Sequence, residues 1–153
     1  VISVLAGRSK DLIILEEEVR KSSDEVVIMT DDGSYGDKGL VTEGIERIIQ
    51  REKVDKCFAI GPAIMMKFVC LLTKKYEIPT DVSLNALMVD GTGMCGACRV
   101  SVGGKTLFTC VDGPEFDGHQ VDFDEAMRRQ AMYKNQERLD NDNREHKCKC
   151  YGE

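Results

Sequence analysis

The chain has 153 residues, of which 42% are hydrophobic and 31% are charged, and its formal net charge is -6. This composition fits one soluble globular domain, alone or with a small appendage, and it excludes intrinsic disorder and collagen. The negative charge argues against nucleic acid as a partner, the apolar runs are too short to span a membrane, and no signal-peptide layout is present. We therefore predict a cytoplasmic protein that binds neither nucleic acid nor membrane.

The first half of the chain, residues 1–79, alternates predicted strands and helices. Short apolar runs rich in β-branched residues predict the strands, and amphipathic patterns predict the helices. Such alternation is typical of a parallel sheet flanked by helices, so we predict an α/β fold for residues 1–79. In chain order the expected elements are a strand at 1–6, a helix at 11–21, a strand at 26–30, a helix at 40–51, a strand at 56–60 and a helix at 63–76.

The loops that follow these strands are the candidate nucleotide site, because ligands of parallel sheets bind at the carboxyl ends of the strands. Each glycine there can equally well make only a turn, and each aspartate can equally well cap one. The candidates are Gly7 and Arg8 after the first strand, Asp31 and Asp32 after the second, and Gly61 and Pro62 after the third.

The phosphate-binding glycine patterns of nucleotide-binding proteins are missing from this sequence, which has neither G-x-G-x-x-G nor a Walker A motif. The chain also begins with Val1 instead of Met. We therefore expect it to be part of a longer protein whose first strand and phosphate loop precede Val1. A doubly wound sheet without that central strand would be split, or would take a strand from elsewhere.

A glycine-rich loop with two cysteines follows, and it is the most specific feature of the sequence. Residues 88–99 read MVDGTGMCGACR, and a hairpin is predicted around Gly103 and Gly104, with Cys110 on its second strand. The spacing Cys95-x2-Cys98, with Asp90 four intervening residues earlier, reproduces the plant-type iron–sulfur pattern C-x4-C-x2-C…C. Aspartate stands where that pattern has its first cysteine.

This loop suits a [2Fe–2S] cluster, which needs four anionic ligands and backbone N–H donors close to its sulfurs. Glycines let the backbone approach closely enough to donate. We predict Asp90, Cys95, Cys98 and Cys110 as the metal ligands. Carboxylate is a harder donor than thiolate, so we expect Asp90 to raise the reduction potential.

Other interpretations of the cysteines remain open. The same four residues can hold Zn²⁺, and Cys-x-x-Cys can be a thiol redox pair, although that motif usually begins a helix and here a strand follows. Simple core cysteines are the third possibility. We predict that role for Cys57 and Cys70, which lie within apolar patterns. For His119 we predict a surface or packing role.

The cluster loop and the stretch from Cys110 to His119 resemble one group of flavoproteins. This group is the small subunit of NADH-dependent ferredoxin:NADP oxidoreductase, which includes sulfide dehydrogenase and hydrogenase electron-transfer subunits. The electron-transfer subunit of dihydroorotate dehydrogenase is similar. The resemblance covers nearly the whole chain, and residues 30–34 and 59–62 resemble the nucleotide-binding half, which is of ferredoxin–NADP reductase type. Aspartate at position 90 favours the ferredoxin:NADP oxidoreductase branch, because the dihydroorotate branch has cysteine there.

The resemblance implies an architecture and a role. The family has an FAD-binding barrel, a nucleotide-binding domain and a small [2Fe–2S] subdomain, and this chain lacks the barrel. It implies Gly61 and Pro62 near the nicotinamide, Gly7 and Arg8 near the adenosine, and Asp31 or Asp32 near the ribose, which would favour NADH over NADPH. It further implies electron relay between NAD(P)H, FAD and a large flavoprotein or iron–sulfur partner subunit, with no catalytic acid, base or nucleophile in this chain.

The residues after the cluster loop are predicted first to pack on the domain and then to extend away from it. We divide the chain into an NAD(P)-binding-like domain (1–79), a cluster subdomain (80–123) and a C-terminal helix with a mobile tail (124–153). Phe116, Val121 and Phe123 are expected to dock, a charged helix is expected at 124–139, and residues 140–145 are expected to be mobile. His146, Cys148 and Cys150 are expected to be exposed on the tail instead of forming a second metal site.

Three functions stay open at this point. The first is an enzyme fragment, inactive alone, that carries an iron–sulfur cluster as part of an NAD(P)H-dependent flavin oxidoreductase. The second is a zinc-binding structural or interaction module fused to an α/β domain. The third is a stand-alone ferredoxin-like carrier without a nucleotide site, which the patterned residues before position 80 disfavour. Within the first, the dihydroorotate dehydrogenase electron-transfer subunit remains an alternative.

Overall fold

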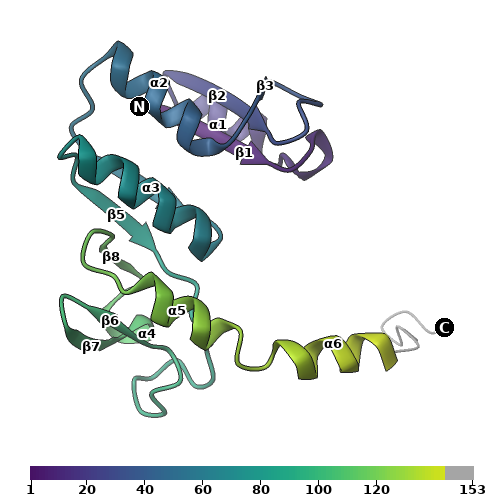
Figure 1. The fold of residues 1–153 in the computed structure, drawn as a ribbon, viewed down its shortest axis with the longest axis vertical. Coiled ribbons are helices and arrows are strands. Elements are labelled where there is room, and N and C mark those ends of the chain that lie inside the picture. The colour runs from purple at the N-terminus through teal and green to yellow at the C-terminus, as the bar shows by residue number, and fades with distance from the viewer. Residues whose placement is uncertain (144–153) are drawn as a thin grey trace.

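A computed structural model of the chain describes residues 1–143 and has a mixed α/β fold (Figure 1). His146, Cys148 and Cys150, considered above as an exposed tail, lie outside the described residues. Within residues 1–143, none of the helices combines the length and the apolar character needed to cross a membrane.

The first sheet contains the first two predicted strands. β1 (Ile2–Gly7) pairs in parallel with β2 (Glu25–Thr30), so that Gly7 lies opposite Thr30. The two-residue β3 (Asp37–Lys38) adds to the other side of β2 and is also parallel. The expectation of a parallel arrangement is confirmed here.

The second sheet is separate from the first. β4 (Cys57–Ile60) pairs in parallel with β5 (Thr80–Ser83), and β8 (Glu115–Asp117) pairs antiparallel with β5. The sheet orders are therefore β1-β2-β3 and β4-β5-β8. The parallel strands form two pieces, one of the two arrangements expected of a doubly wound sheet without its central strand.

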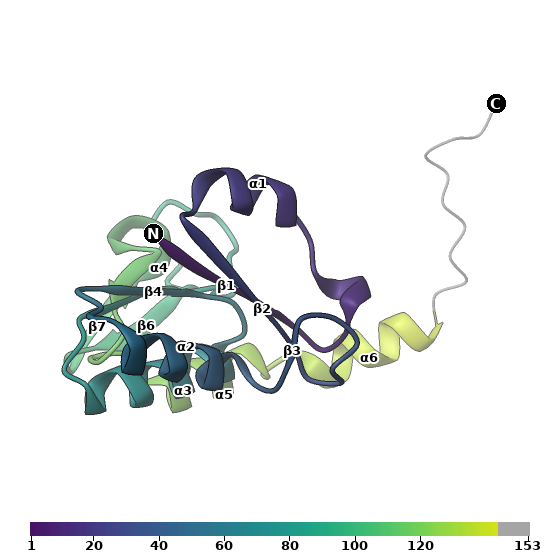
Figure 2. The same cartoon turned by 90° about the horizontal axis from the view of Figure 1, so that it is seen from above.

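Helices cover the strands mainly on one side. Figure 2 shows α2 (Val41–Arg51), α3 (Ala63–Lys75) and α5 (Phe123–Gln130) on one face of the strands and α1 (Glu16–Ser22) on the other. α2 packs against both β1 and α3, so it links the two sheets.

One hydrophobic core joins the second sheet, α3, α5 and the cysteine-rich hairpin. The expected docking of Phe116, Val121 and Phe123 is confirmed, because Phe116 and Phe123 are buried in this core and Val121 packs against it. Burial of each large side chain contributes about 1.5–3 kcal/mol to folding. The buried members are Ala59, Ala63, Met66, Val69, Cys70, Val82, Leu84, Val100, Phe116 and Phe123.

The prediction of a helix at 11–21 was wrong for the first half of this range. A short 3-10 turn (Lys10–Leu12) comes first, and α1 begins only at Glu16. Leu15 has a φ of 56°, which is left-handed and stops a helix from running through it. The side chains of Ile14 and Leu15 are more than half exposed, so they do not form the buried helical face that the apolar pattern suggested. Three glutamates at the start of α1 favour the observed beginning.

The helix predicted at 124–139 is two helices. α5 ends at Gln130, and α6 (Lys134–Asn143) begins after a turn and points away from the body of the molecule (Figure 1). The Asp122 carboxylate accepts the Glu125 N–H at 2.8 Å and fixes the start of α5. The break follows from packing, because α5 buries Phe123 whereas α6 has no buried apolar face among its described side chains. The predicted end of the helix at residue 139 was also wrong, since α6 continues through Asn143.

Candidate functional site

The cysteine-rich hairpin forms as predicted, but Cys110 is not on its second strand. β6 (Arg99–Val102) pairs antiparallel with β7 (Lys105–Phe108), and a short helix, α4 (Thr109–Asp112), carries Cys110. The correction has a clear cause. The Thr109 N–H and hydroxyl both donate to the Cys98 carbonyl, at 3.1 and 2.9 Å, and turn the chain back toward Cys98.

Two of the candidate ligands form a thiol pair. The sulfurs of Cys98 and Cys110 are 3.3 Å apart. Cys98 is only 2% exposed, whereas Cys110 is half-buried. The hydrogen bond with Cys98, followed by desolvation, raises the pKa of the Cys110 thiol. A metal ion can therefore reach two sulfurs from one position beside this pair.

The other two candidate ligands form a second pair. The Asp90 carboxylate accepts the Thr92 N–H at 2.9 Å on one oxygen and the Cys95 N–H at 3.1 Å on the other. The Thr92 N–H contributes most to a lowered pKa of Asp90, and hydrogen bonds from Cys95 lower it as well. Asp90 is thus held as an anion against Cys95, whose side chain is exposed.

Backbone amides of the loop face the cysteine sulfurs. The Ala97 N–H donates to the Cys95 sulfur at 3.4 Å, and the Gly93 N–H lies against the Cys110 sulfur, where its hydrogen bond favours the thiolate. Gly93 has a φ of +82°, which a residue with a side chain rarely adopts. A Cβ at Gly93 would also lie 3.1 Å from the Val111 side chain. The loop therefore depends on glycine to bring its amides to the sulfurs.

The chemical types of the four candidate ligands suit an iron–sulfur cluster. Three thiols and one carboxylate are all ligands that deprotonate to anions, and thiolates suit iron–sulfur clusters. Among residues 1–143, no three His, Cys, Asp or Glu side chains converge on a single metal position. The four candidates form two pairs instead, Cys98 with Cys110 and Asp90 with Cys95, and a two-iron cluster takes two protein ligands at each iron.

The structure brings four of the nucleotide candidates together. The Asp31 N–H donates to the Gly7 carbonyl at 3.1 Å, and the Asp32 N–H donates to the Arg8 carbonyl at 3.2 Å. The ends of β1 and β2 are therefore side by side at one edge of the first sheet, where a ligand of a parallel sheet binds.

The two aspartates differ in what their side chains do. Asp32 accepts both the N–H and the hydroxyl of Ser34, at 2.9 and 2.7 Å, so it acts as the turn cap that was one of its two interpretations. The Ser34 hydroxyl bond is the main cause of a lowered pKa of Asp32. The Asp31 side chain is exposed and is the better placed of the two to accept from a bound ligand.

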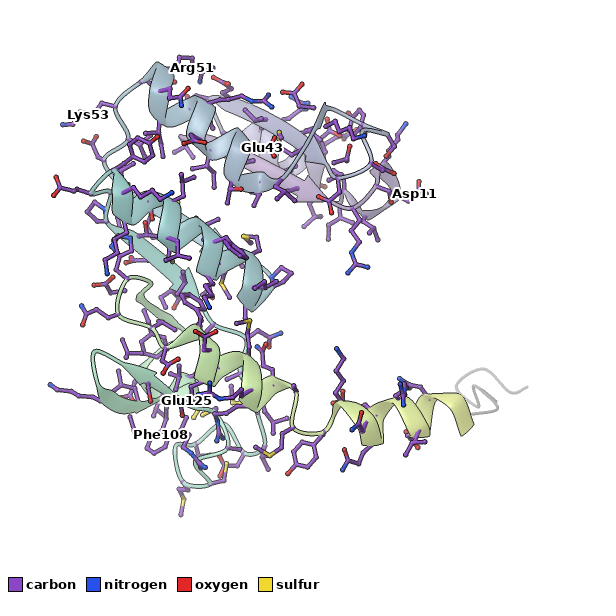
Figure 3. The ribbon with its side chains drawn as sticks, viewed as in Figure 1. Asp11, Glu43, Arg51, Lys53, Phe108 and Glu125 are labelled. Atoms are coloured by element: carbon purple, nitrogen blue, oxygen red, sulfur yellow. The ribbon has the colours of Figure 1, made fainter. Side chains whose placement is uncertain are left out.

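Gly61 and Pro62 lie apart from these four residues, at the end of β4 in the second sheet. Pro62 is the N-cap of α3. Gly61 has a φ of +155°, and a Cβ at this position would collide with the Met65 side chain. The cysteine loop lies further still from the first sheet. Figure 3 shows Asp11, beside the first sheet, and Phe108, next to the cysteines, at opposite ends of the molecule.

Two arginines contact the cysteine loop, and the sequence analysis did not predict either contact. Arg99 donates to the Gly96 carbonyl at 3.2 Å, and Arg129 of α5 donates to the Ala97 carbonyl at 2.9 Å. In the sequence, the adjacent Arg128 and Arg129 indicate only positive charge that complements the helix dipole. No pattern in the sequence relates Arg129 to a loop more than thirty residues earlier.

The other cysteines and His119 occupy structural positions. Cys70 is buried, and burial raises the pKa of its thiol to about 12. Burial also raises the pKa of the half-buried Cys57. The His119 Nε2 lies 3.1 Å from the Thr73 hydroxyl, in a packing position away from the cysteine loop.

The chain is similar to several known proteins. Residues 85–122 match the model of the iron–sulfur cluster binding domain of dihydroorotate dehydrogenase B. A protein of Thermotoga maritima named as a dihydroorotate dehydrogenase B (NAD(+)) electron transfer subunit homolog is 50% identical over 91% of this chain and 49% of its own length. The chain is homologous to electron-transfer subunits of this kind. The expected resemblance is therefore confirmed.

Two further proteins are also similar to this chain. An uncharacterised protein from the adh 3' region of Clostridium beijerinckii is 57% identical over 88% of this chain and 46% of its own length. A solved structure of NADH-dependent reduced ferredoxin–NADP oxidoreductase, described for flavin-based electron bifurcation, superposes with a TM-score of 0.82 and 48% identity, over 92% of this chain and 51% of that one. The chain thus spans about half the length of the relatives it matches.

Proposed function

We propose that this chain carries a [2Fe–2S] cluster and serves as the electron-transfer part of an NAD(P)H-dependent flavin oxidoreductase. The main support for this proposal is the cysteine loop, in which Asp90 with Cys95 and Cys98 with Cys110 form two pairs of candidate ligands. Its match to an iron–sulfur binding domain supports the same assignment. Because the chain corresponds to about half of its relatives, it takes part in the reaction of a larger protein.

The bound cluster supplies one-electron transfer, and the residues of this chain hold it and set its potential. The three thiolates and the Asp90 carboxylate provide the negative charge that the irons require. The amides of Gly93 and Ala97 donate to the sulfurs of Cys110 and Cys95 and would stabilise an electron added to the cluster. No side chain needs to act as an acid, a base or a nucleophile.

The nucleotide and the partners belong to the same proposal. Gly7, Arg8 and Asp31 form one edge that suits the adenosine part of NAD(H) or NADP(H), and Gly61 and Pro62 suit the nicotinamide part. FAD would be held by the larger protein, and a large flavoprotein or iron–sulfur subunit would receive or supply the electrons. The division into a nucleotide-binding part (1–79), a cluster part (80–123) and a C-terminal part (124–153) is retained in this proposal.

The first experiment is an anaerobic preparation of the chain with iron and zinc analysis, visible absorbance and EPR after dithionite reduction. Two irons per chain, broad visible bands and a rhombic S = 1/2 signal are expected. One zinc per chain in a colourless protein would overturn the proposal and favour a structural zinc module. A metal-free preparation is reconstituted with iron and sulfide, and failure to take up iron then counts against the proposal.

Asp90 separates the proposed branch from the alternative dihydroorotate dehydrogenase electron-transfer subunit. Asp90→Cys replaces a hard carboxylate by a thiolate, which donates more electron density to iron. We expect the midpoint potential to fall while two irons per chain are retained, as measured by a redox titration followed by EPR. An unchanged potential would show that Asp90 is not a ligand, and Asp11→Cys, at an exposed position at the opposite end of the molecule, provides the control.

A further inference from the structure

The last turn of α5 is attached to the loop that holds the proposed ligands. The Arg129 Nη2 donates to the Ala97 carbonyl at 2.9 Å, and the Gln130 side-chain amide donates to the Asn85 carbonyl. Ala97 lies between Cys95 and Cys98. One helix turn thus holds both the loop and the segment that leads into it.

α5 is itself firmly placed, so it can hold the loop in position. Phe123 in its first turn is buried in the main core, and Met127 packs against that core. Asp124 receives an ion pair from Lys67 of α3 at 2.7 Å. Movement of the loop away from Arg129 therefore requires either a broken hydrogen bond or a shift of a packed helix.

The hydrogen bonds to the loop carbonyls set the direction of the loop amides. In a trans peptide unit the C=O and the N–H point in opposite directions. Arg99 holds the Gly96 carbonyl at 3.2 Å, and the N–H of that same unit, on Ala97, donates to the Cys95 sulfur at 3.4 Å. Arg129 holds the next carbonyl in the chain, so the Cys98 N–H points away from Arg129.

We propose that Arg129 is a positioning residue for the iron–sulfur cluster, acting through the peptide unit between Ala97 and Cys98. This inference rests on the proposed function. The guanidinium fixes the Ala97 carbonyl and polarises the peptide, which strengthens the Cys98 N–H as a donor on the side away from Arg129. Its positive charge also favours the reduced cluster, which carries one more negative charge. Arg129 is half-buried and anchored on α5, whereas the Arg99 side chain is exposed, so Arg129 has the larger effect.

The chain contains a matched control in the neighbouring residue. Arg128 has the same charge and lies on the same helix, but its side chain is exposed, while the Ala97 carbonyl is held by Arg129. Arg128→Gln and Arg129→Gln remove the same charge from adjacent positions. The difference between them isolates the contact with the loop from the general loss of positive charge.

The test is a redox titration, followed by EPR, of the reconstituted chain and its variants. At a fixed potential we expect Arg129→Gln to lower the ratio of reduced to oxidised cluster about tenfold, which is about 59 mV for a one-electron couple. Arg128→Gln should change the ratio less than about twofold. Arg129→Lys keeps the charge and should recover more than half of the shift. Equal effects of Arg128→Gln and Arg129→Gln would overturn the proposal.

A second measurement does not depend on the cluster. In the metal-free chain, Arg129→Gln should speed hydrogen–deuterium exchange of the amides at 95–98 about tenfold, with no change after Arg128→Gln. Unchanged exchange in Arg129→Gln would show that the arginine does not hold the loop. If the unsubstituted chain takes up no iron, the proposed function fails, and this exchange measurement still decides whether Arg129 holds the loop.

Discussion

The two ends of the molecule assemble their candidate sites in different ways. At the cysteine end, all four proposed ligands come from residues 90–110, and a single loop with one hairpin brings them into two pairs. At the nucleotide end, the candidates follow three strands that belong to two separate sheets. The candidate site at the cysteine end is therefore built within one short segment, whereas the candidate site at the nucleotide end depends on how two sheets are placed.

Cysteine alkylation offers the largest contrast between the site and the core. Thiolate is the reactive form, and burial raises the pKa of Cys70 to about 12, so this thiol stays protonated and unreactive until the pH approaches 12. In the metal-free chain at pH 8, iodoacetamide should modify the exposed Cys95 more than about a hundredfold faster than Cys70. Peptide mass mapping measures the two rates.

The same alkylation experiment can contradict the ligand assignment. Reconstitution with iron should protect Cys95, Cys98 and Cys110 and leave the slow rate of Cys70 unchanged. If Cys95 reacts equally fast with and without iron, it does not bind the cluster.

Substitution of the two neighbouring aspartates tests the nucleotide end. Asp31→Ala should weaken AMP binding about tenfold to a hundredfold, because a hydrogen bond to a charged group contributes about 1.5–3 kcal/mol. Asp32→Ala should have a smaller effect, since that carboxylate is occupied by Ser34. Calorimetric titration with AMP measures both variants. A larger loss for Asp32→Ala would reverse the assignment of cap and ligand contact.

Two loop glycines give the smallest and most local effect. Gly91 and Gly93 both have a left-handed φ, so alanine at either costs about 1–2 kcal/mol. Only at Gly93 would the new Cβ meet a neighbour, Val111 at 3.1 Å, whereas nothing lies within 4 Å at Gly91. Cluster loss, followed by visible absorbance, should therefore be faster in Gly93→Ala than in Gly91→Ala. Equal rates would show that contact with Val111 is unimportant.

The sequence predicts the local features well because their causes are local. The alternating elements from Ile2 to Lys75 follow from apolar periodicity, and the cysteine spacing with its glycines identifies the loop. The prediction for 11–21 failed at Leu15, where an apolar run that looks helical has a left-handed residue and exposed side chains. Periodicity reports which residues are apolar, but it does not report whether anything covers them.

The features that the sequence did not predict depend on contacts between distant segments. Cys110 moves from a strand to a short helix because Thr109 bonds to the Cys98 carbonyl. Arg129 reaches Ala97 only after α5 has docked on the core. The division of the parallel strands into two sheets likewise depends on tertiary pairing, and the sequence allowed it only as one of two outcomes.

The outer edge of β1 affects how this chain, prepared by itself, behaves at high concentration. β1 pairs with β2 on one side only, and among the described residues no strand pairs with its other side, although its sequence is mostly apolar. An unpaired apolar strand presents a row of backbone donors and acceptors to any other extended chain. We therefore expect self-association to limit the concentration of this chain when it is purified by itself, and a lysine placed on β1 to raise that limit without touching the cysteine loop.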